Sequence, residues 1–128
     1  MIRLEQVVFK YEDMTMSFDA EIADGCFLAI IGPSGAGKST LLNLIAGYET
    51  PSSGRISING LDMAGLGPHQ RPVSMIFQDN NVFAHLDVWQ NAAIGIAPSL
   101  RLSGTQRLSV DNALAMVGLA ALAKRKPG

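Results

Sequence analysis

Gly32-Pro33-Ser34-Gly35-Ala36-Gly37-Lys38-Ser39-Thr40 fits the pattern G-x-x-x-x-G-K-[ST] at every fixed position. Its glycines permit backbone conformations closed to other residues, so the loop can turn its N–H groups inward around an anion. The helix expected next would point its unpaired N–H groups and its dipole at the same anion. Lys38 adds a positive charge, and Ser39 adds a hydroxyl group suited to Mg²⁺. The stretch therefore predicts a loop that binds nucleotide phosphates.

The segments on either side of the loop support this prediction. Residues 26–31 form an apolar run, which predicts a strand buried on both faces with Cys26 in the core. Residues 41–46 are mostly apolar and end at Gly47, which predicts a helix with a glycine cap. Strand, glycine loop and helix follow in the required order. A plain Gly-Ser turn is the alternative, but it gives no reason for a lysine at the helix start.

Composition limits the size of the protein and the classes of partner. A chain of 128 residues with 48% hydrophobic content has room for one small domain. The net charge is -1 and the one basic run is Lys124-Arg125-Lys126, so we do not expect nucleic acid as a partner. The single cysteine excludes an intramolecular disulfide and fits a reducing compartment. No apolar run approaches the ~20 residues of a membrane span, so membrane association is expected only through a partner.

Hydrophobic periodicity predicts the other elements of an α/β fold. Alternating residues predict strands, and i, i+3, i+4, i+7 spacing predicts helices. The expected strands are 2–11, 15–22, 55–59 and 72–77, and the expected helical stretches follow Asp87, cover 110–117 and run through 119–126.

Two further side chains are candidates for the same site. Tyr11 precedes Gly32 by 21 residues, and aromatic rings stack on purines, although a lone tyrosine more often packs in a core. Gln78 follows an expected strand, and ligands in α/β sheets bind beyond the carboxyl ends of strands. Gln78 could therefore reach the site of Lys38, or it could be a loop glutamine bonded to backbone.

Together these residues resemble the ATP-binding subunits of ABC transporters. Tyr11 resembles the adenine-stacking aromatic residue, and Phe77-Gln78 with the segment 82–88 resembles the glutamine loop. The resemblance covers essentially the whole chain and implies a P-loop NTPase of the ABC type that uses ATP and Mg²⁺. It also implies catalytic contacts from Lys38 and Gln78, and metal contacts from Ser39 and Gln78.

The resemblance also implies partners and a location. A transmembrane permease would contact the Gln78 loop, a second copy would pair head to tail, and the protein would lie peripherally on the cytoplasmic face of the inner membrane. Residues 32–47 and 71–81 look most like the subfamily that drives thiamine import, with iron, sulfate or polyamine import as alternatives. A soluble non-transport ABC-type module is a further alternative. Such modules usually have a basic surface or a long insertion near the position of Gln78, whereas the net charge here is -1. An unrelated P-loop kinase or GTPase would need neither Tyr11 nor Gln78.

The family pattern also predicts what these residues lack. We expect residues 1–90 to form the β subdomain and the first half of the P-loop core, and 91–128 to begin the helical subdomain. Leu102-Ser103-Gly104-Thr105-Gln106 looks like the family signature, but it follows Gln78 by only 24 residues and has Thr105 in place of a glycine. We therefore expect an N-terminal portion that stops before the signature. By itself, this portion should bind MgATP weakly and should not hydrolyse it. We also expect its sheet to expose apolar edges.

Overall fold

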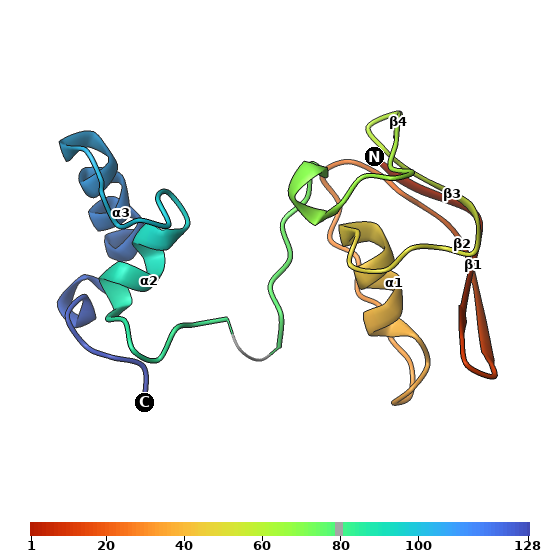
Figure 1. Ribbon diagram of the computed structural model, residues 1–128, viewed down its shortest axis with the longest axis horizontal. Coiled ribbons are helices and arrows are strands. Elements are labelled where there is room, and N and C mark those ends of the chain that lie inside the picture. The colour runs from red at the N-terminus through yellow and green to blue at the C-terminus, as the bar shows by residue number, and fades with distance from the viewer. Residues whose placement is uncertain (79–80) are drawn as a thin grey trace. The chain divides into compact units, whose positions relative to one another are not determined.

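The computed structural model describes residues 1–78 and 81–128, which form two compact units, Met1–Met75 and Ile76–Gly128 (Figure 1). The sequence analysis placed its boundary at residue 90 on family architecture. Compactness divides the chain earlier, because the helix that crosses residue 90 packs with the helix after it. The expected subdomain bounds stay a prediction about the family arrangement.

The first unit is built on an antiparallel sheet with strand order β2-β1-β3-β4 (Figure 1). The strands expected at 2–11, 15–22 and 55–59 are confirmed within about two residues, because their alternating side chains give each one an apolar face. The four strands of this sheet are β1 (Ile2–Tyr11), β2 (Met14–Ile22), β3 (Ser53–Ile58) and β4 (Leu61–Asp62).

Helix α1 (Lys38–Ala46) packs on this sheet and closes the core of the first unit. Its Leu44 is fully buried, and Ile45 lies beside it in the same cluster. Burying such a side chain contributes roughly 1.5–3 kcal/mol. The cluster joins both helix residues to the strands and consists of Leu4, Val7, Phe9, Leu44, Ile45, Ile56, Ile58 and Met63.

The strands expected at 26–31 and 72–77 are absent, so these two predictions were wrong (Figure 1). Both segments are irregular, and among the described residues neither has a ladder partner. An apolar run predicts a buried strand, but a strand also needs neighbours for its N–H and C=O groups. Cys26 is exposed rather than buried, and its Sγ donates to Ala23 O at 3.0 Å.

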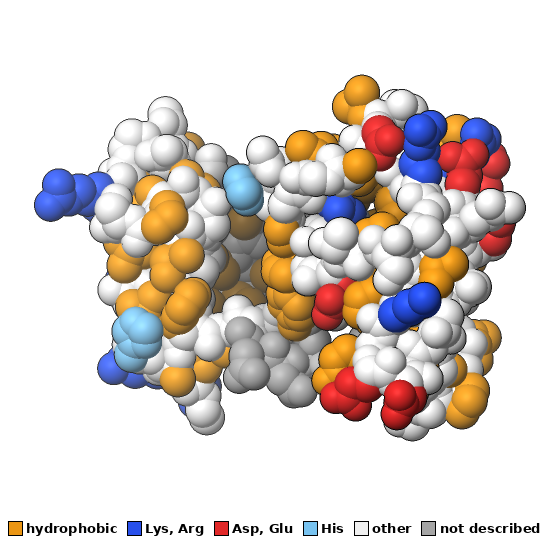
Figure 2. Space-filling model, turned by 45° about the vertical axis from the view of Figure 1, so that its right-hand side comes forward, with side chains coloured by type: hydrophobic (Ala, Val, Ile, Leu, Met, Phe, Trp, Pro, Cys, Tyr) orange, Lys and Arg blue, Asp and Glu red, His pale blue; other side chains and the backbone are white. Residues whose placement is uncertain are grey.

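Apolar side chains of these two segments are correspondingly exposed. Figure 2 shows that hydrophobic side chains lie at the surface of the molecule. Ile31 is 91% exposed and Ile76 is 89% exposed. In the first unit an apolar groove of about 240 Å³ is lined by Leu28, Ile30 and Val73. The exposed apolar surface therefore belongs to irregular segments, and the expectation of exposed apolar sheet edges stays a prediction.

The second unit is a small helical cluster. It contains α2 (Val88–Ile94), α3 (Gly104–Met116) and the 3₁₀ turn η2 (Ala120–Leu122), and a further 3₁₀ turn, η1 (Pro68–Gln70), belongs to the first unit. Val110 and Leu114 of α3 pack on Ala93 of α2, as the helical spacing predicted. Within the described residues, no helix combines the length and hydropathy needed to cross a bilayer.

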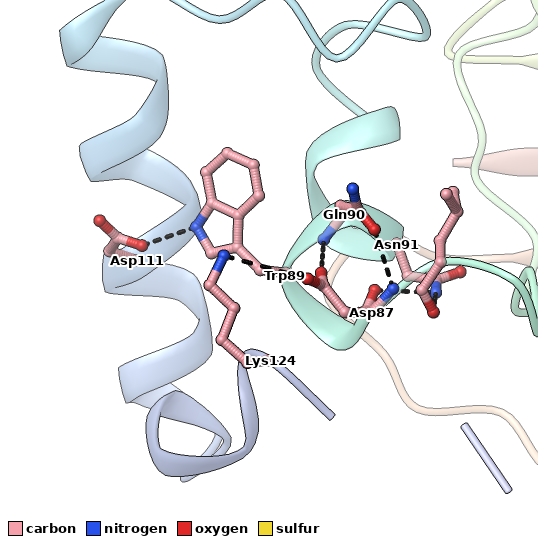
Figure 3. Close-up of polar contacts among 7 residues, drawn as sticks. Asp87, Trp89, Gln90, Asn91, Asp111 and Lys124 are labelled. Carbon is pink, nitrogen blue, oxygen red and sulfur yellow. Dashed lines mark hydrogen bonds and ion pairs between the residues drawn. The ribbon is translucent and has the colours of Figure 1, made fainter. Parts of the chain in front are cut away.

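Trp89 joins the parts of this second unit (Figure 3). Its Nε1 donates to Asp111 Oδ1 at 2.7 Å, and Lys124 Nζ lies 5.8 Å from the ring centroid. The backbone N–H of Trp89 donates to Ala123 O at 2.9 Å, so the segment after η2 satisfies a donor in the first turn of α2.

Candidate phosphate-binding site

The loop before α1 takes a backbone path that requires glycine. Gly35 has φ of 81° and Gly37 has φ of 85°, both in the left-handed region. A Cβ on Gly37 would lie 2.8 Å from Met16 Sδ, so the loop passes directly against β2. A Cβ on Gly32 would lie 3.3 Å from the Cβ of Ala36, which shows how tightly the loop is wound.

The Lys38 side chain folds back onto the first residues of the loop. Its ammonium group donates to Gly32 O at 2.8 Å and to Pro33 O at 2.7 Å, while Ala36 N donates to Pro33 O at 3.2 Å. The positive charge is therefore held inside the ring of backbone that residues 32–38 form. An anionic oxygen entering the ring would meet this ammonium directly.

The start of α1 is suited to an anion, and the starts of α2 and α3, the other α-helices among the described residues, are not. Asp87 and Ser103 cap α2 and α3 by accepting a backbone N–H, whereas the N-cap of α1 is Gly37, which has no side chain. The first turn of α1 also contains no acidic residue. Its N–H groups and the positive end of the helix dipole thus face the loop without a side-chain cap.

Ser39 and Thr40 stand in this first turn, and Ser39 is exposed. A hydroxyl oxygen beside a phosphate loop is the kind of ligand that Mg²⁺ accepts, since this ion keeps several waters and takes few protein ligands. The donor chemistry of the loop therefore fits a nucleotide phosphate with Mg²⁺.

Tyr11 lies at the exposed end of β1, and strand register places it on the loop side of the hairpin. Phe9 pairs with Met16 and Tyr11 pairs with Met14, so all four side chains share one face. Met16 is the residue that contacts Gly37. Phe9 lies opposite Met16, and Tyr11 follows Phe9 by two residues on the same face, so the backbone of Tyr11 is about 7 Å further along β1.

Gln78 is exposed and belongs to the second unit. Next to it, Phe77 N donates to Asn81 Oδ1 at 2.9 Å, and Asn81 Nδ2 donates back to Phe77 O. This pair holds Phe77, the residue that precedes Gln78. Its expected approach to Lys38 stays a prediction.

Arg71 is a residue of this region that the sequence analysis missed. Its guanidinium donates to main-chain carbonyls at the end of α1 and in the loop after β4, and desolvation by burial lowers its pKa from the ordinary value. A guanidinium nevertheless stays protonated in proteins. The resemblance over 71–81 included Arg71 but gave it no role, because its acceptors are carbonyls that every residue carries.

Comparison with known proteins identifies the family of this chain. Residues 15–128 match the ABC transporter family model. The chain is 58% identical over 126 residues to the thiamine import ATP-binding protein ThiQ of Brucella suis, and 50% identical over 127 residues to that of Yersinia pseudotuberculosis. These matches cover 98% and 99% of the chain, but 52% and 54% of the two relatives.

A solved structure with the same fold is the dimeric post-hydrolysis state of the ATP-binding cassette MJ0796 bound to ADP and Pi. It has a TM-score of 0.79 and 26% sequence identity, covering 99% of this chain and 62% of that one. The P-loop NTPase fold of the ABC type is thereby confirmed. The chain spans about half the length of its curated relatives, and it belongs to the ABC transporter family.

Proposed function

We propose that these residues bind MgATP and form part of the ATP-binding subunit of a bacterial ABC importer that takes up thiamine. The observation that carries the proposal is the glycine loop with Lys38 held across it at the uncapped start of α1. The thiamine import proteins of Brucella suis and Yersinia pseudotuberculosis, which share half or more of the aligned residues, support the solute.

In this proposal the loop and α1 position the ATP phosphates and stabilise their charge. Phosphoryl transfer depends mainly on such positioning and charge stabilisation. The Lys38 ammonium would leave Gly32 O and Pro33 O to bind phosphate oxygens, and Ser39 would hold the metal. When bound, Mg²⁺ would supply positive charge that stabilises the phosphate oxygens. Tyr11 would stack on adenine, and Gln78 would contact Mg²⁺ and orient the attacking water.

The proposed partners follow from the family and from a dimeric relative. The MJ0796 cassette with ADP and Pi bound is a dimer, which supports pairing of two copies of the whole protein. We propose that the segment around Gln78 contacts a transmembrane permease. The subunit would then lie peripherally on the cytoplasmic face of the membrane.

Nucleotide binding is tested with Lys38→Ala in the full-length protein. Loss of a charge-assisted contact of about 1.5–3 kcal/mol should raise the Kd for MgATP by at least about tenfold and abolish phosphate release. Lys10→Ala is the matched control, because Lys10 is an exposed lysine of β1. Equal MgATP affinity in the two variants would contradict the proposal.

The solute is tested by uptake in cells that lack the gene. Radiolabelled thiamine should enter cells that carry the wild-type gene and not those that carry Lys38→Ala. Unchanged thiamine uptake together with a loss of iron, sulfate or polyamine uptake would support import of that other solute instead.

A further inference from the structure

We propose that Arg71 is a positioning residue for the phosphate loop: it holds the far end of α1, and α1 carries Lys38 and Ser39 at its near end. The inference rests on the proposed nucleotide-binding function. It assigns Arg71 a role through the helix rather than a contact with nucleotide.

The guanidinium connects the end of α1 to the sheet. Arg71 Nη1 donates to Leu44 O at 2.6 Å and to Ile45 O at 3.0 Å, two carbonyls of the last turn of α1. Arg71 Nη2 donates to Met63 O at 3.2 Å. Met63 is 1% exposed and its N–H donates to Ile56 O of β3 at 2.9 Å. The end of α1 is thus tied through one side chain to the buried part of the sheet.

A second tie runs to the loop that precedes η1. Arg71 Nε donates to Leu66 O at 2.9 Å, so all three guanidinium nitrogens have main-chain acceptors. A lysine has one nitrogen and could not reach the same acceptors together, whereas the planar guanidinium presents its donors in a fixed fork.

Gly47, the C-cap of α1, leaves room for this side chain. A Cβ on Gly47 would lie 2.5 Å from Arg71 Nε and 2.9 Å from its Cζ. The guanidinium therefore passes directly over the helix end. There its charge also complements the negative end of the helix dipole.

The geometry of α1 connects this contact to the phosphate loop. The helix has nine residues and rises about 1.5 Å per residue, so a tilt of about 5° at the Arg71 end moves the Lys38 end by about 1 Å. A misplacement of about 1 Å can cost up to about 100-fold in a positioned reaction. Holding the end of α1 would thus help to keep Lys38 and the loop N–H groups in place.

The test compares Arg71→Met and Arg71→Lys with wild type in the full-length protein. Arg71→Met keeps the length of the side chain and removes its donors, and it should raise the Kd for MgADP and the KM for MgATP by about tenfold. Arg71→Lys keeps the charge without the fork and should fall between wild type and Arg71→Met.

The control is Val110→Ala, which makes a cavity at a residue that is 2% exposed in the core of the second unit. It should lower the Tm without changing nucleotide affinity well below the Tm. A purely structural role for Arg71 predicts the same pattern for Arg71→Met, and wild-type affinity in that variant would overturn the inference.

Two other outcomes have separate meanings. If Arg71→Met does not fold, Arg71→Lys decides, and wild-type affinity in this variant overturns the inference. If the wild-type protein itself binds no MgADP, the proposed function fails, and this inference fails with it.

Discussion

Position 37 favours glycine for two reasons, and both concern the Cβ atom that glycine lacks. The residue has φ of 85°, where a Cβ is strained, and that Cβ would lie 2.8 Å from Met16 Sδ. We expect Gly37→Ala to lower the free energy of unfolding by about 1–3 kcal/mol, measured by urea denaturation. Gly104→Ala is the control, because its Cβ would meet nothing within 4 Å and it lies in α3. Equal midpoints for the two variants would contradict the prediction.

The helix caps can be tested at the scale of the element. Asp87 Oδ1 accepts from Gln90 N at 2.7 Å, and Gln90 Oε1 accepts from Asp87 N at 3.0 Å, which makes a capping box (Figure 3). Asp87→Ala should destabilise the protein by about 1 kcal/mol. The Lys124 ammonium, 3.9 Å from Asp87, adds little, because Lys124 is largely exposed. Thermal unfolding of Asp87→Ala against the exposed-residue control Asp19→Ala measures the cap, and no difference would exclude it.

Elements with a strong local pattern were the predictable ones. Strands β1 and β2 have alternating apolar spacing, helix α1 has an apolar run that ends at Gly47, and each forms close to where these local features predicted. Residues 26–31 and 72–77 have equally apolar sequences but form no strand. Whether these two segments form strands depends on neighbouring strands that can pair with them. The periodicity of a single segment contains no information about such neighbours.

Uncovered apolar surface determines the expected behaviour of the whole 128-residue chain. The groove beside Leu28 and the exposed Ile31 and Ile76 leave surface of a kind that promotes association. We expect the isolated chain to bind a hydrophobic dye such as ANS and to aggregate at micromolar concentration, as light scattering would measure. A monomeric, dye-free chain under these conditions would contradict the prediction.

Catalysis by the isolated chain is a separate question at the same scale. We expect these residues to lack the signature that the family resemblance implies, and phosphoryl transfer depends on positioning groups of this kind. We expect the 128-residue chain to bind MgATP weakly and to release phosphate for less than one turnover. Multiple turnovers that Lys38→Ala abolishes would show that this expectation is wrong.

The amino-acid sequence by itself determined the phosphate loop. The glycines and Lys38 act within one short stretch, and their spacing is what allows that stretch to bind phosphate. The sequence also determined strands β1 and β2 and the helix beside that loop, since alternation, an apolar run and a glycine cap are local features. Only the tertiary structure decided that Met16 lies against Gly37 and that Arg71 holds the end of α1. Arg71 and Leu44 are 27 residues apart, and no local pattern encodes a contact between a side chain and so distant a main-chain carbonyl.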